Sequence, residues 1–214
     1  MSSTNKNIAH DLKKNGVAYI QPGNLFYTDE DWQQINAIIN HQDLPWEKIL
    51  IGDADERNDL LVARFMTDID IPRYVNTPLS TQLKGVVCNE AIWNFFSELL
   101  DGEDFYLRRM QVNKMREDSF IGRHLDIDSN PDYLYSVVLQ LGQNFSGGEF
   151  TVYNSSGVVS DKIQPALGSV IISDCTFAHE VNTVLQGDRI SLVFFVSKHA
   201  DKNRRVRAKT AEHA

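Results

Sequence analysis

The run Arg189-Ile-Ser-Leu-Val-Phe-Phe-Val196 is a strongly β-prone stretch near the end of this chain. A second apolar run, Gly168-Ser-Val-Ile-Ile-Ser-Asp174, precedes it and ends in turn-forming residues. From Asp104 onward, short runs of this kind alternate with Gly, Asn, Asp and Pro. The second half of the sequence therefore predicts an all-β core, built as a double-sheet jelly roll.

The first half is typical of helices that pack outside such a core. Residues 5–14 predict one helix, and the capping-box-like Thr28-Asp-Glu-Asp31 begins another. Residues 80–100 place apolar side chains at roughly helical spacing and predict one amphipathic helix against the sheet. Residues 44–77 are polar and weakly periodic, so we expect either disorder or a lid over a site.

No linker separates the two halves, and the length suits one domain. We assign residues 1–197 to that domain, with a helix-rich part at 1–103 and the jelly-roll core at 104–197. Residues 198–214 hold six Lys or Arg against two acidic residues, which predicts a basic, flexible tail.

Charge and composition restrict the partners and the location. The chain carries −8 in total and its tail +4, so residues 1–197 carry −12. An acidic body repels phosphate backbones, which argues against nucleic acid as a partner. The two cysteines, Cys88 and Cys175, lack metal-type pairing and suit a reducing compartment. No apolar signal region or membrane-length apolar run is present, so we expect a cytoplasmic protein with no membrane partner.

A candidate metal site lies in the β-rich half. His124 and Asp126 stand two residues apart, and alternate residues of an extended segment project to one face. His179 follows the apolar run that ends at Asp174, so it lies at the mouth of a strand. Each residue alone has a plainer explanation, such as a core histidine. Together, two histidines and one carboxylate form the arrangement with which non-haem Fe(II) oxygenases leave metal positions open.

Arg189 and Ser191 are candidates for binding an anionic ligand beside that metal. The guanidinium of Arg189 can form a bidentate pair with a carboxylate, and Ser191 on the same strand face adds a hydroxyl donor. The alternatives are a surface salt bridge for Arg189 and a solvated strand serine. Within the whole series, the pair indicates a dicarboxylate co-substrate.

Residues 105–197 resemble the 2-oxoglutarate- and Fe(II)-dependent dioxygenase superfamily, in particular its small prolyl-4-hydroxylase-like members. The His-x-Asp motif of that family falls on His124 and Asp126, and its distal ligand falls on His179. Its Arg-x-Ser motif, which binds the far carboxylate of 2-oxoglutarate, falls on Arg189 and Ser191.

Two further motifs resemble this family: the Gly-Gly-Glu turn within 146–150 and the Pro-x-x-Gly strand entry within 163–172. The resemblance implies a double-stranded β-helix (a cupin-like jelly roll) that uses Fe(II), 2-oxoglutarate and O₂. It implies decarboxylation of 2-oxoglutarate to succinate and CO₂, coupled to attack on an unactivated C–H. Because halogenating members lack the carboxylate ligand, Asp126 favours hydroxylation, or a related desaturation.

The sequence departs from the family where a tyrosine commonly contacts the co-substrate. Met115 stands at that position, and Asp118 stands where a glycine turn follows. Asn113, two residues before Met115 on the same strand face, matches an asparagine that some branches use, and Gln111 continues along that face. We expect Asn113 and Gln111 to contact the keto-acid end of the co-substrate; the alternative for Asn113 is an ordinary strand-end amide.

We expect the substrate to be a small polar metabolite, such as a free amino acid or an amino-acid-like natural-product intermediate. Arg64 or Arg73 would pair with its carboxylate, and Trp46 would supply aromatic surface. Alternation places Asp128 on the same side as Asp126, so we expect it either to support a metal ligand or to face the substrate. A prolyl-type protein hydroxylase and a cupin-like metal-binding protein without turnover are the alternatives.

Overall fold

The structure is a computed structural model and describes residues 2–24 and 26–206. Its helices are α1 (Ser3–Asn15), α2 (Asp29–Ile39), α3 (Leu79–Val87), α4 (Glu90–Leu99) and the short 3₁₀ helix η1 (Asp126–Asp128). Its strands in the first half are β1 (Val17–Ile20), β2 (Glu47–Ile51), β3 (Arg57–Thr67) and β4 (Arg73–Tyr74). Those in the second half are β5 (Tyr106–Met115), β6 (Phe120–His124), β7 (Tyr133–Gln140), β8 (Ser146–Gly147), β9 (Phe150–Tyr153), β10 (Val159–Ile163), β11 (Val170–Asp174), β12 (His179–Val181), β13 (Val184–Gln186) and β14 (Arg189–Ser197).

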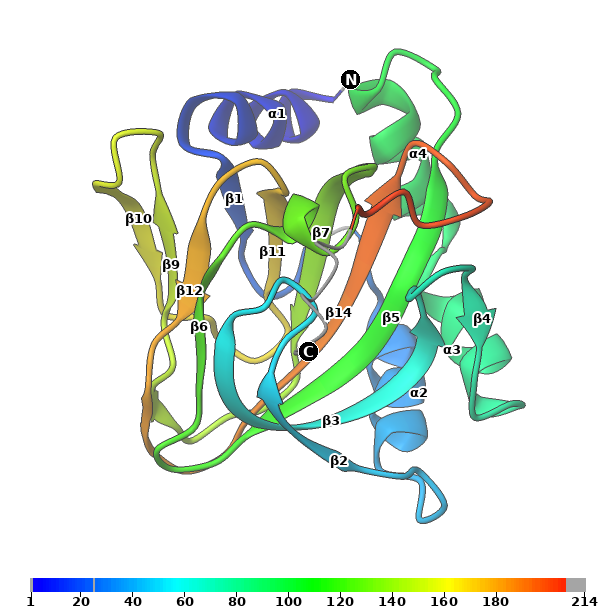
Figure 1. Cartoon of the computed structure of the whole chain (residues 1–214). Coiled ribbons are helices and arrows are strands. Elements are labelled where there is room, and N and C mark those ends of the chain that lie inside the picture. The colour runs from blue at the N-terminus through cyan, green and yellow to red at the C-terminus, as the bar shows by residue number, and fades with distance from the viewer. Residues whose placement is uncertain (1, 25, 207–214) are drawn as a thin grey trace, which may run out of the picture.

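Twelve of the described strands form one strongly curved antiparallel sheet with two facing layers, and β8 and β13 pair in a separate two-stranded sheet (Figure 1). The strand order is β1-β11-β7-β14-β5-β3-β6-β12-β9-β10, with β2 and β4 added to β3. Strand β3 joins the layers, because it pairs with β5 along much of its length while Asn58 and Asp59 near its start pair with β6. The predicted jelly-roll core is therefore confirmed.

Strand β14 shows why this part of the sequence is continuously apolar. Leu192, Phe194 and Val196 belong to the apolar core beneath the helices. Val193 and Phe195, which alternate with them, face the space between the two sheet layers. Both faces of β14 are covered, so the strand has no solvent face on which polar residues would be expected. Each large apolar side chain buried in this way contributes roughly 1.5–3 kcal/mol.

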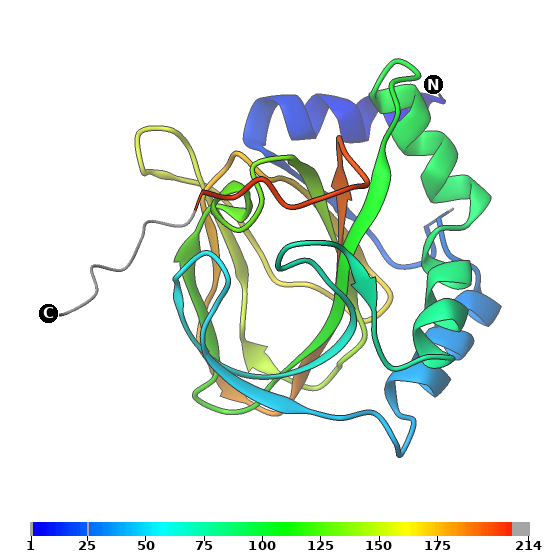
Figure 2. The same ribbon diagram turned by 45° about the vertical axis from the view of Figure 1, so that its right-hand side comes forward.

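The helices cover the outer face of the layer that contains β14 and β5 (Figure 2). Helix α2 begins at the predicted capping box, in which the Thr28 hydroxyl accepts a hydrogen bond from the backbone N–H of Asp31. The Asp31 carboxylate in turn accepts one from the backbone N–H of Thr28. Helix α1 ends at Gly16, whose φ of 75° only glycine adopts freely. The prediction of helices packed outside the core is confirmed.

The single helix predicted over 80–100 is two helices, α3 and α4. The break falls at Cys88 and Asn89, where the Asn89 side chain caps α4 by accepting a hydrogen bond from the backbone N–H of Ile92. The same side chain donates to the carbonyl of Phe26, which fixes the junction against the start of the α2 segment. The apolar period alone could not reveal this break, because both helices bury their apolar faces in the same core.

The segment 44–77 is not an irregular insert, as the sequence suggested, but contains β2, β3 and β4. Strand β3 lies within the curved sheet, and between β2 and β4 only the turn at 52–56 and the short loop before β4 lack strand structure. The polar residues Asn58 and Arg64 interrupt the apolar pattern of β3, because they lie on the face of the strand that lines the cavity. What remains of the expected lid is the β2–β3 turn.

The basic tail predicted for residues 198–214 is described as far as residue 206. In that part, Arg204 pairs with Asp132 at 2.7 Å, and Arg205 pairs with Asp55 of the β2–β3 turn at 2.6 Å. Residues 207–214 lie outside the described residues.

A buried ion pair holds the loop after β3 to the centre of the sheet. The side chains of Arg108 on β5 and Asp68 are both fully buried and paired. Asp68 also accepts hydrogen bonds from Asn130 and from the Tyr133 hydroxyl, each at 2.8 Å. A second guanidinium N–H of Arg108 donates to the carbonyl of His199. This network joins β3, β5, the segment after η1 and the C-terminal segment.

Replacement of Asp68 by alanine should therefore destabilise the fold strongly. The change leaves the charge of Arg108 buried without its partner, which typically costs about 3–5 kcal/mol in the free energy of unfolding. Asp68→Asn should reduce the free energy of unfolding by less, because the amide retains part of the hydrogen bonding. Urea unfolding measures both, with Asp59→Ala as the control, since Asp59 pairs with Lys48 at the exposed surface. Equal losses for Asp68→Ala and Asp59→Ala would contradict the importance of the buried pair.

Candidate active site

His124, Asp126 and His179 meet between the two sheet layers. His124 ends β6 and His179 begins β12, and these strands pair so that the two histidines are register partners. Their ring centroids lie 4.5 Å apart. Asp126 follows through the extended Leu125, and its two carboxylate oxygens lie 3.4 Å from His124 Nε2 and 3.6 Å from His179 Nε2. The three potential ligand atoms all lie within 4.8 Å of one another.

The hydrogen bonds of these side chains suit a divalent metal. His124 Nδ1 lies 2.8 Å from the carbonyl of Gly122, and His179 Nδ1 lies 3.1 Å from that of Phe177. A carbonyl only accepts hydrogen bonds, so each Nδ1 carries a hydrogen and each ring directs Nε2 toward the centre, where a metal can take its lone pair. Asp126 Oδ2 is buried and accepts no hydrogen bond from the described residues. Two imidazole nitrogens and one carboxylate are a ligand set of the Fe(II) type.

Without a metal, the charge of Asp126 is balanced by protons. Burial would lower the pKa of His124, but the hydrogen bond and the charge of Asp126 raise it to about 9. Burial would raise the pKa of Asp126, but the charge of His179 and the hydrogen bond of His124 lower it to about 2. Burial lowers the pKa of His179. A cation between the three side chains replaces the proton that the carboxylate attracts.

Arg189 is a buried cation with no acidic partner among the described residues. It is 1% exposed, and burial lowers its pKa to about 10, so it remains charged near neutral pH. One terminal nitrogen donates to the Ser191 hydroxyl at 3.3 Å and approaches the sulfur of Met115 at 3.7 Å. The other terminal nitrogen and Nε are buried without any hydrogen-bond acceptor. A buried guanidinium with free N–H groups requires an anion, and its fork suits a carboxylate.

The Gly-Gly turn after β8 leaves room for this arginine. A Cβ atom on Gly148 would lie 2.9 Å from Arg189 Cδ and 3.1 Å from a methyl group of Val184. Gly148 also has a φ of 65°, a conformation that other residues rarely adopt. Met115, at the position of the expected tyrosine, packs its sulfur against the guanidinium rather than offering a hydroxyl.

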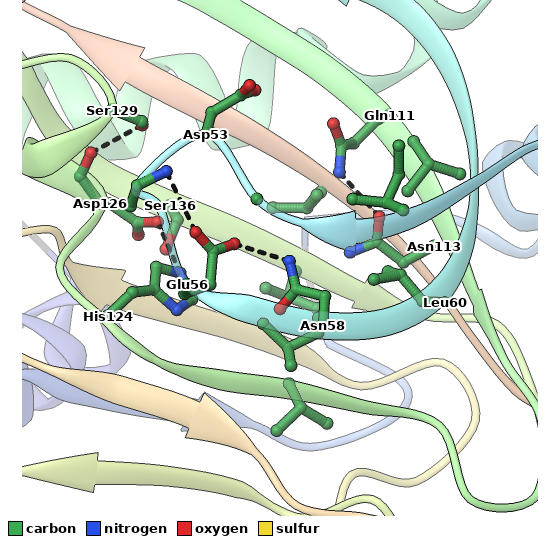
Figure 3. Close-up of a pocket in the computed structure, with 18 of the residues that line it drawn as sticks. Asp53, Glu56, Asn58, Leu60, Gln111, Asn113, His124, Asp126, Ser129 and Ser136 are labelled. Carbon is green, nitrogen blue, oxygen red and sulfur yellow. Dashed lines mark hydrogen bonds and ion pairs between the residues drawn. The ribbon is translucent and has the colours of Figure 1, made fainter. Parts of the chain in front are cut away.

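Asn113 and Gln111 lie beside Arg189 and Ser191, on the neighbouring strand β5. Asn113 is the register partner of Ser191, and the Gln111 amide donates to the Asn113 carbonyl oxygen at 2.8 Å. Arg109 Nε donates to the Gln111 carbonyl oxygen at 3.1 Å. The three side chains form a hydrogen-bonded row along the wall of the site, of which Figure 3 shows the bond between Gln111 and Asn113.

One cavity of about 100 Å³ connects these groups. The sequence-predicted residues that line it are His124, Asp126, His179, Arg189, Ser191, Asn113, Gln111 and Arg64. Three of the predicted substrate residues do not line it: Trp46, Arg73 and Asp128. Trp46 precedes the edge strand β2, and Arg73 is exposed on β4. Asp128 lies in η1, where helical geometry replaces the strand alternation from which its direction was predicted.

Sequence reasoning missed the polar groups that the β2–β3 turn brings over the metal site. Asp53, Glu56 and Asn58 all line the cavity, and the picture places Glu56 between His124 and Asn58 (Figure 3). Asp53 forms an ion pair with Arg109 at 2.7 Å. Only the long-range pairing of β3 with β6 places this turn beside the metal ligands, so no local motif could have indicated it.

Arg109 was also missed, although its backbone is unusual. It is the extra residue of a β-bulge, because Phe194 and Phe195 pair with Met110 and Arg108 and leave Arg109 without a register partner. Its φ of 42° is rare for a residue with a side chain. The bulge turns the Arg109 side chain over the ring of Phe195 and into the cavity.

A histidine–carboxylate centre between the layers of a jelly roll defines the class of non-haem iron oxygenases. A family model described as the 2OG-Fe(II) oxygenase superfamily matches residues 110–197. The crystal structure of a 2OG-Fe(II) oxygenase family oxidoreductase from Burkholderia pseudomallei is 36% identical in sequence, with a TM-score of 0.86. The match covers 96% of each chain. This chain belongs to the 2-oxoglutarate- and Fe(II)-dependent oxygenase family.

Membership makes the protein an enzyme that uses Fe(II), 2-oxoglutarate and O₂. The alternative of a metal-binding protein without turnover is thereby set aside. No curated protein matches the sequence. Within the described residues, no helix has both the length and the apolar character needed to cross a membrane.

More distant structures share the fold. A prolyl-4-hydroxylase from Pseudomonas putida is 16% identical, with a TM-score of 0.62 and coverage of 91% of this chain and 99% of that one. The 2-oxoglutarate-dependent epimerase SnoN of nogalamycin biosynthesis is 10% identical, with a TM-score of 0.68 and coverage of 92% and 82%. At these identities the likeness shows the architecture alone.

Loss of any one metal-binding side chain should remove iron. We expect His124→Ala, Asp126→Ala and His179→Ala each to abolish Fe(II) binding, because each deletes one of only three protein ligands. The weak visible band of the anaerobic Fe(II)–2-oxoglutarate complex should disappear with it. Metal analysis and anaerobic absorption spectra provide the measurement, and His199→Ala is the control, since His199 is half exposed and remote from the cavity. Normal iron content in two of the three variants would show that the ligand set is wrong.

Proposed function

We propose that this oxygenase hydroxylates an unactivated C–H bond of a small polar metabolite, with release of succinate and CO₂. His124, Asp126 and His179 are the proposed iron ligands. Arg189 and Ser191 are proposed to bind the far carboxylate of 2-oxoglutarate. The observation that carries this assignment is the buried, unpaired guanidinium of Arg189 at the floor of the cavity that the metal triad also lines.

Iron, when bound, supplies the activation of O₂ and the oxidation of 2-oxoglutarate on which attack on a C–H bond depends. The chain supplies the binding and the orientation. The Nδ1 hydrogen bonds of His124 and His179 hold both rings so that Nε2 faces the centre. Arg189 fixes one end of the co-substrate, and Asn113 and Gln111 offer amide groups along its length.

The walls of the cavity exclude water from the reacting groups. Val138, Phe150 and Val181 are buried there, and the Phe150 ring stacks on the imidazole of His179 at a centroid distance of 5.0 Å. A dry wall strengthens the electrostatic contacts inside and limits side reactions of the activated oxygen species with solvent. Asp126 supports hydroxylation rather than halogenation, because it occupies the position that a halide would need.

A small substrate is supported by the way in which the cavity is covered. The β2–β3 turn lies over it, and ion pairs fasten this turn at Asp53 to Arg109 and at Asp55 to Arg205. Arg64 lines the cavity from β3 and pairs with Glu47, an exposed acid that a substrate carboxylate can replace. We therefore retain Arg64 as the proposed partner of a substrate carboxylate. The acidic body argues against nucleic acid.

A protein hydroxylase of the prolyl type is the second candidate. Strand β2 is an edge strand that pairs only with β3. Its Leu50 and Ile51 are exposed, and Ile51 also lines the cavity. An extended polypeptide can add to such an edge. The choice between the two candidates is a question of substrate, which the experiments below address.

Arg189→Ala should retain iron but lose affinity for 2-oxoglutarate by at least tenfold, since a charge-assisted bidentate contact is worth roughly 1.5–3 kcal/mol. Arg189→Lys should not restore full affinity, because an ammonium cannot reproduce the fork. Ser191→Ala should reduce the affinity for 2-oxoglutarate by less than Arg189→Ala does. Calorimetric titration of 2-oxoglutarate into the anaerobic iron-loaded protein gives these affinities.

The buried charge of Arg189 also leads to a prediction about stability, which can be tested without turnover. Arg189→Met removes a buried unpaired charge, so the ligand-free variant should unfold at a denaturant concentration equal to or higher than that of the unchanged protein. Unchanged 2-oxoglutarate affinity in Arg189→Ala would refute the proposed contact.

The substrate proposal is tested with a panel of free amino acids and short peptides, monitored by succinate release and by mass spectrometry for the addition of one oxygen atom. We expect turnover with a free amino acid or a close relative. Arg64→Gln should raise the KM of that substrate by roughly tenfold through loss of a charged contact, while uncoupled 2-oxoglutarate turnover persists. Arg73→Gln is the matched control, because Arg73 does not line the cavity. A clear preference for polypeptides would favour the prolyl-type hydroxylase instead.

A further inference from the structure

The carboxylate of Glu56 is an uncompensated charge in the cavity. Glu56 closes the β2–β3 turn, where its backbone carbonyl accepts a hydrogen bond from the N–H of Gly52 at 2.8 Å. Its side chain folds back over Gly52, where a Cβ atom would collide with the carboxylate. The glycine thus allows the carboxylate to turn into the cavity, on the side of His124 (Figure 3).

The partners of Glu56 are neutral. One carboxylate oxygen accepts a hydrogen bond from the backbone N–H of Ala54 at 3.0 Å, and the other accepts one from the Asn58 amide at 2.8 Å. These bonds fix the orientation of the group but do not balance its charge. A carboxylate has about four acceptor positions, so two remain for another donor.

The other charges around the cavity cancel. Arg109 is paired with Asp53, and Arg64 is paired with Glu47. Fe(II), the 2-oxoglutarate dicarboxylate, Asp126 and Arg189 together carry no net charge. Within the described residues that line the cavity, Glu56 therefore leaves one negative charge in excess, since Arg109, the cation that acts on it, is already paired with Asp53.

We propose that Glu56 is a specificity residue that binds an ammonium group of the substrate. The inference rests on the proposed function, in which a small polar metabolite enters this cavity. The ammonium would fill the acceptor positions of Glu56 that face the cavity and neutralise the remaining charge. A free amine and a lysyl side chain share this chemistry, and the structure favours the free amine because the β2–β3 turn covers the cavity.

The test measures binding without turnover, in the full-length protein loaded with Mn(II) and 2-oxoglutarate. The probes are pairs that differ in one ammonium group: L-norvaline against pentanoate, L-lysine against L-norleucine, and Nα-acetyl-L-lysine methylamide against its norleucine counterpart. The first two pairs represent free amino acids, and the third represents a lysyl peptide. Calorimetry gives the affinity of each probe for the unchanged protein, for Glu56→Gln and for the control Asp59→Asn, which alters a solvent-exposed acid three residues further along the chain, on β3.

We expect at least one ammonium compound to bind the unchanged protein tenfold or more tightly than its partner compound. Glu56→Gln should reduce that preference below threefold, whereas Asp59→Asn should leave it intact. The absence of any ammonium preference in the unchanged protein, including the case in which no probe binds, would overturn the proposal, as would a preference that survives Glu56→Gln. An unchanged thermal unfolding midpoint for Glu56→Gln shows that the effect is not a loss of folding. Failure of the proposed function is a separate result, namely that no small substrate gains an oxygen atom with the Fe(II) enzyme.

Discussion

The rest of the site is arranged around one buried charge without a counter-charge. A guanidinium removed from water and left unpaired is costly, and the fold keeps Arg189 at 1% exposure with two of its nitrogens lacking acceptors. The surrounding residues leave room for the guanidinium but do not neutralise its charge. Gly148 leaves space for the side chain, Met115 offers only a sulfur, and Ser191 offers a single hydroxyl. In the proposed function this charge is balanced when the dicarboxylate binds, and the stability that the ligand-free fold gives up then contributes to affinity and selectivity for that co-substrate.

The two layers of the sheet contribute different halves of this site. The metal-binding side chains come from β6, β12 and the turn into η1, whereas Arg189 and Asn113 come from β14 and β5 in the opposite layer. Their separation is therefore set by the packing of one layer on the other. Strand β3 pairs with both layers and curves between them, which makes it the element that determines the width of the cavity (Figure 1).

Sequence reasoning succeeded where a site depends on short spacing within strands. The spacing of His124 and Asp126, and the position of Arg189 at the head of an apolar run, predicted a constellation that the structure brings together. It failed where a residue reaches the site through a distant pairing or an irregular backbone. Glu56 depends on the pairing of β3 with β6, and Arg109 depends on a β-bulge, and neither leaves a periodic signal. Strand β3 itself was missed because a strand that borders a polar cavity does not show clean apolar alternation.

The two sides of the cavity differ in how firmly they are fixed: the floor consists of sheet strands, whereas the cover is the β2–β3 turn. The floor is made of buried strands paired on both sides, so it moves only if the sheet itself opens. The covering turn is fastened by ion pairs whose acidic partners, Asp53 and Asp55, are 42% and 81% exposed in their side chains. Ion pairs with a solvent-exposed acid contribute about 1 kcal/mol each, because water competes for the carboxylate. The turn can therefore open at small cost for a substrate to enter while the metal ligands and Arg189 keep their positions, which is the division between mobile and rigid parts that an oxygenase with a covered cavity needs.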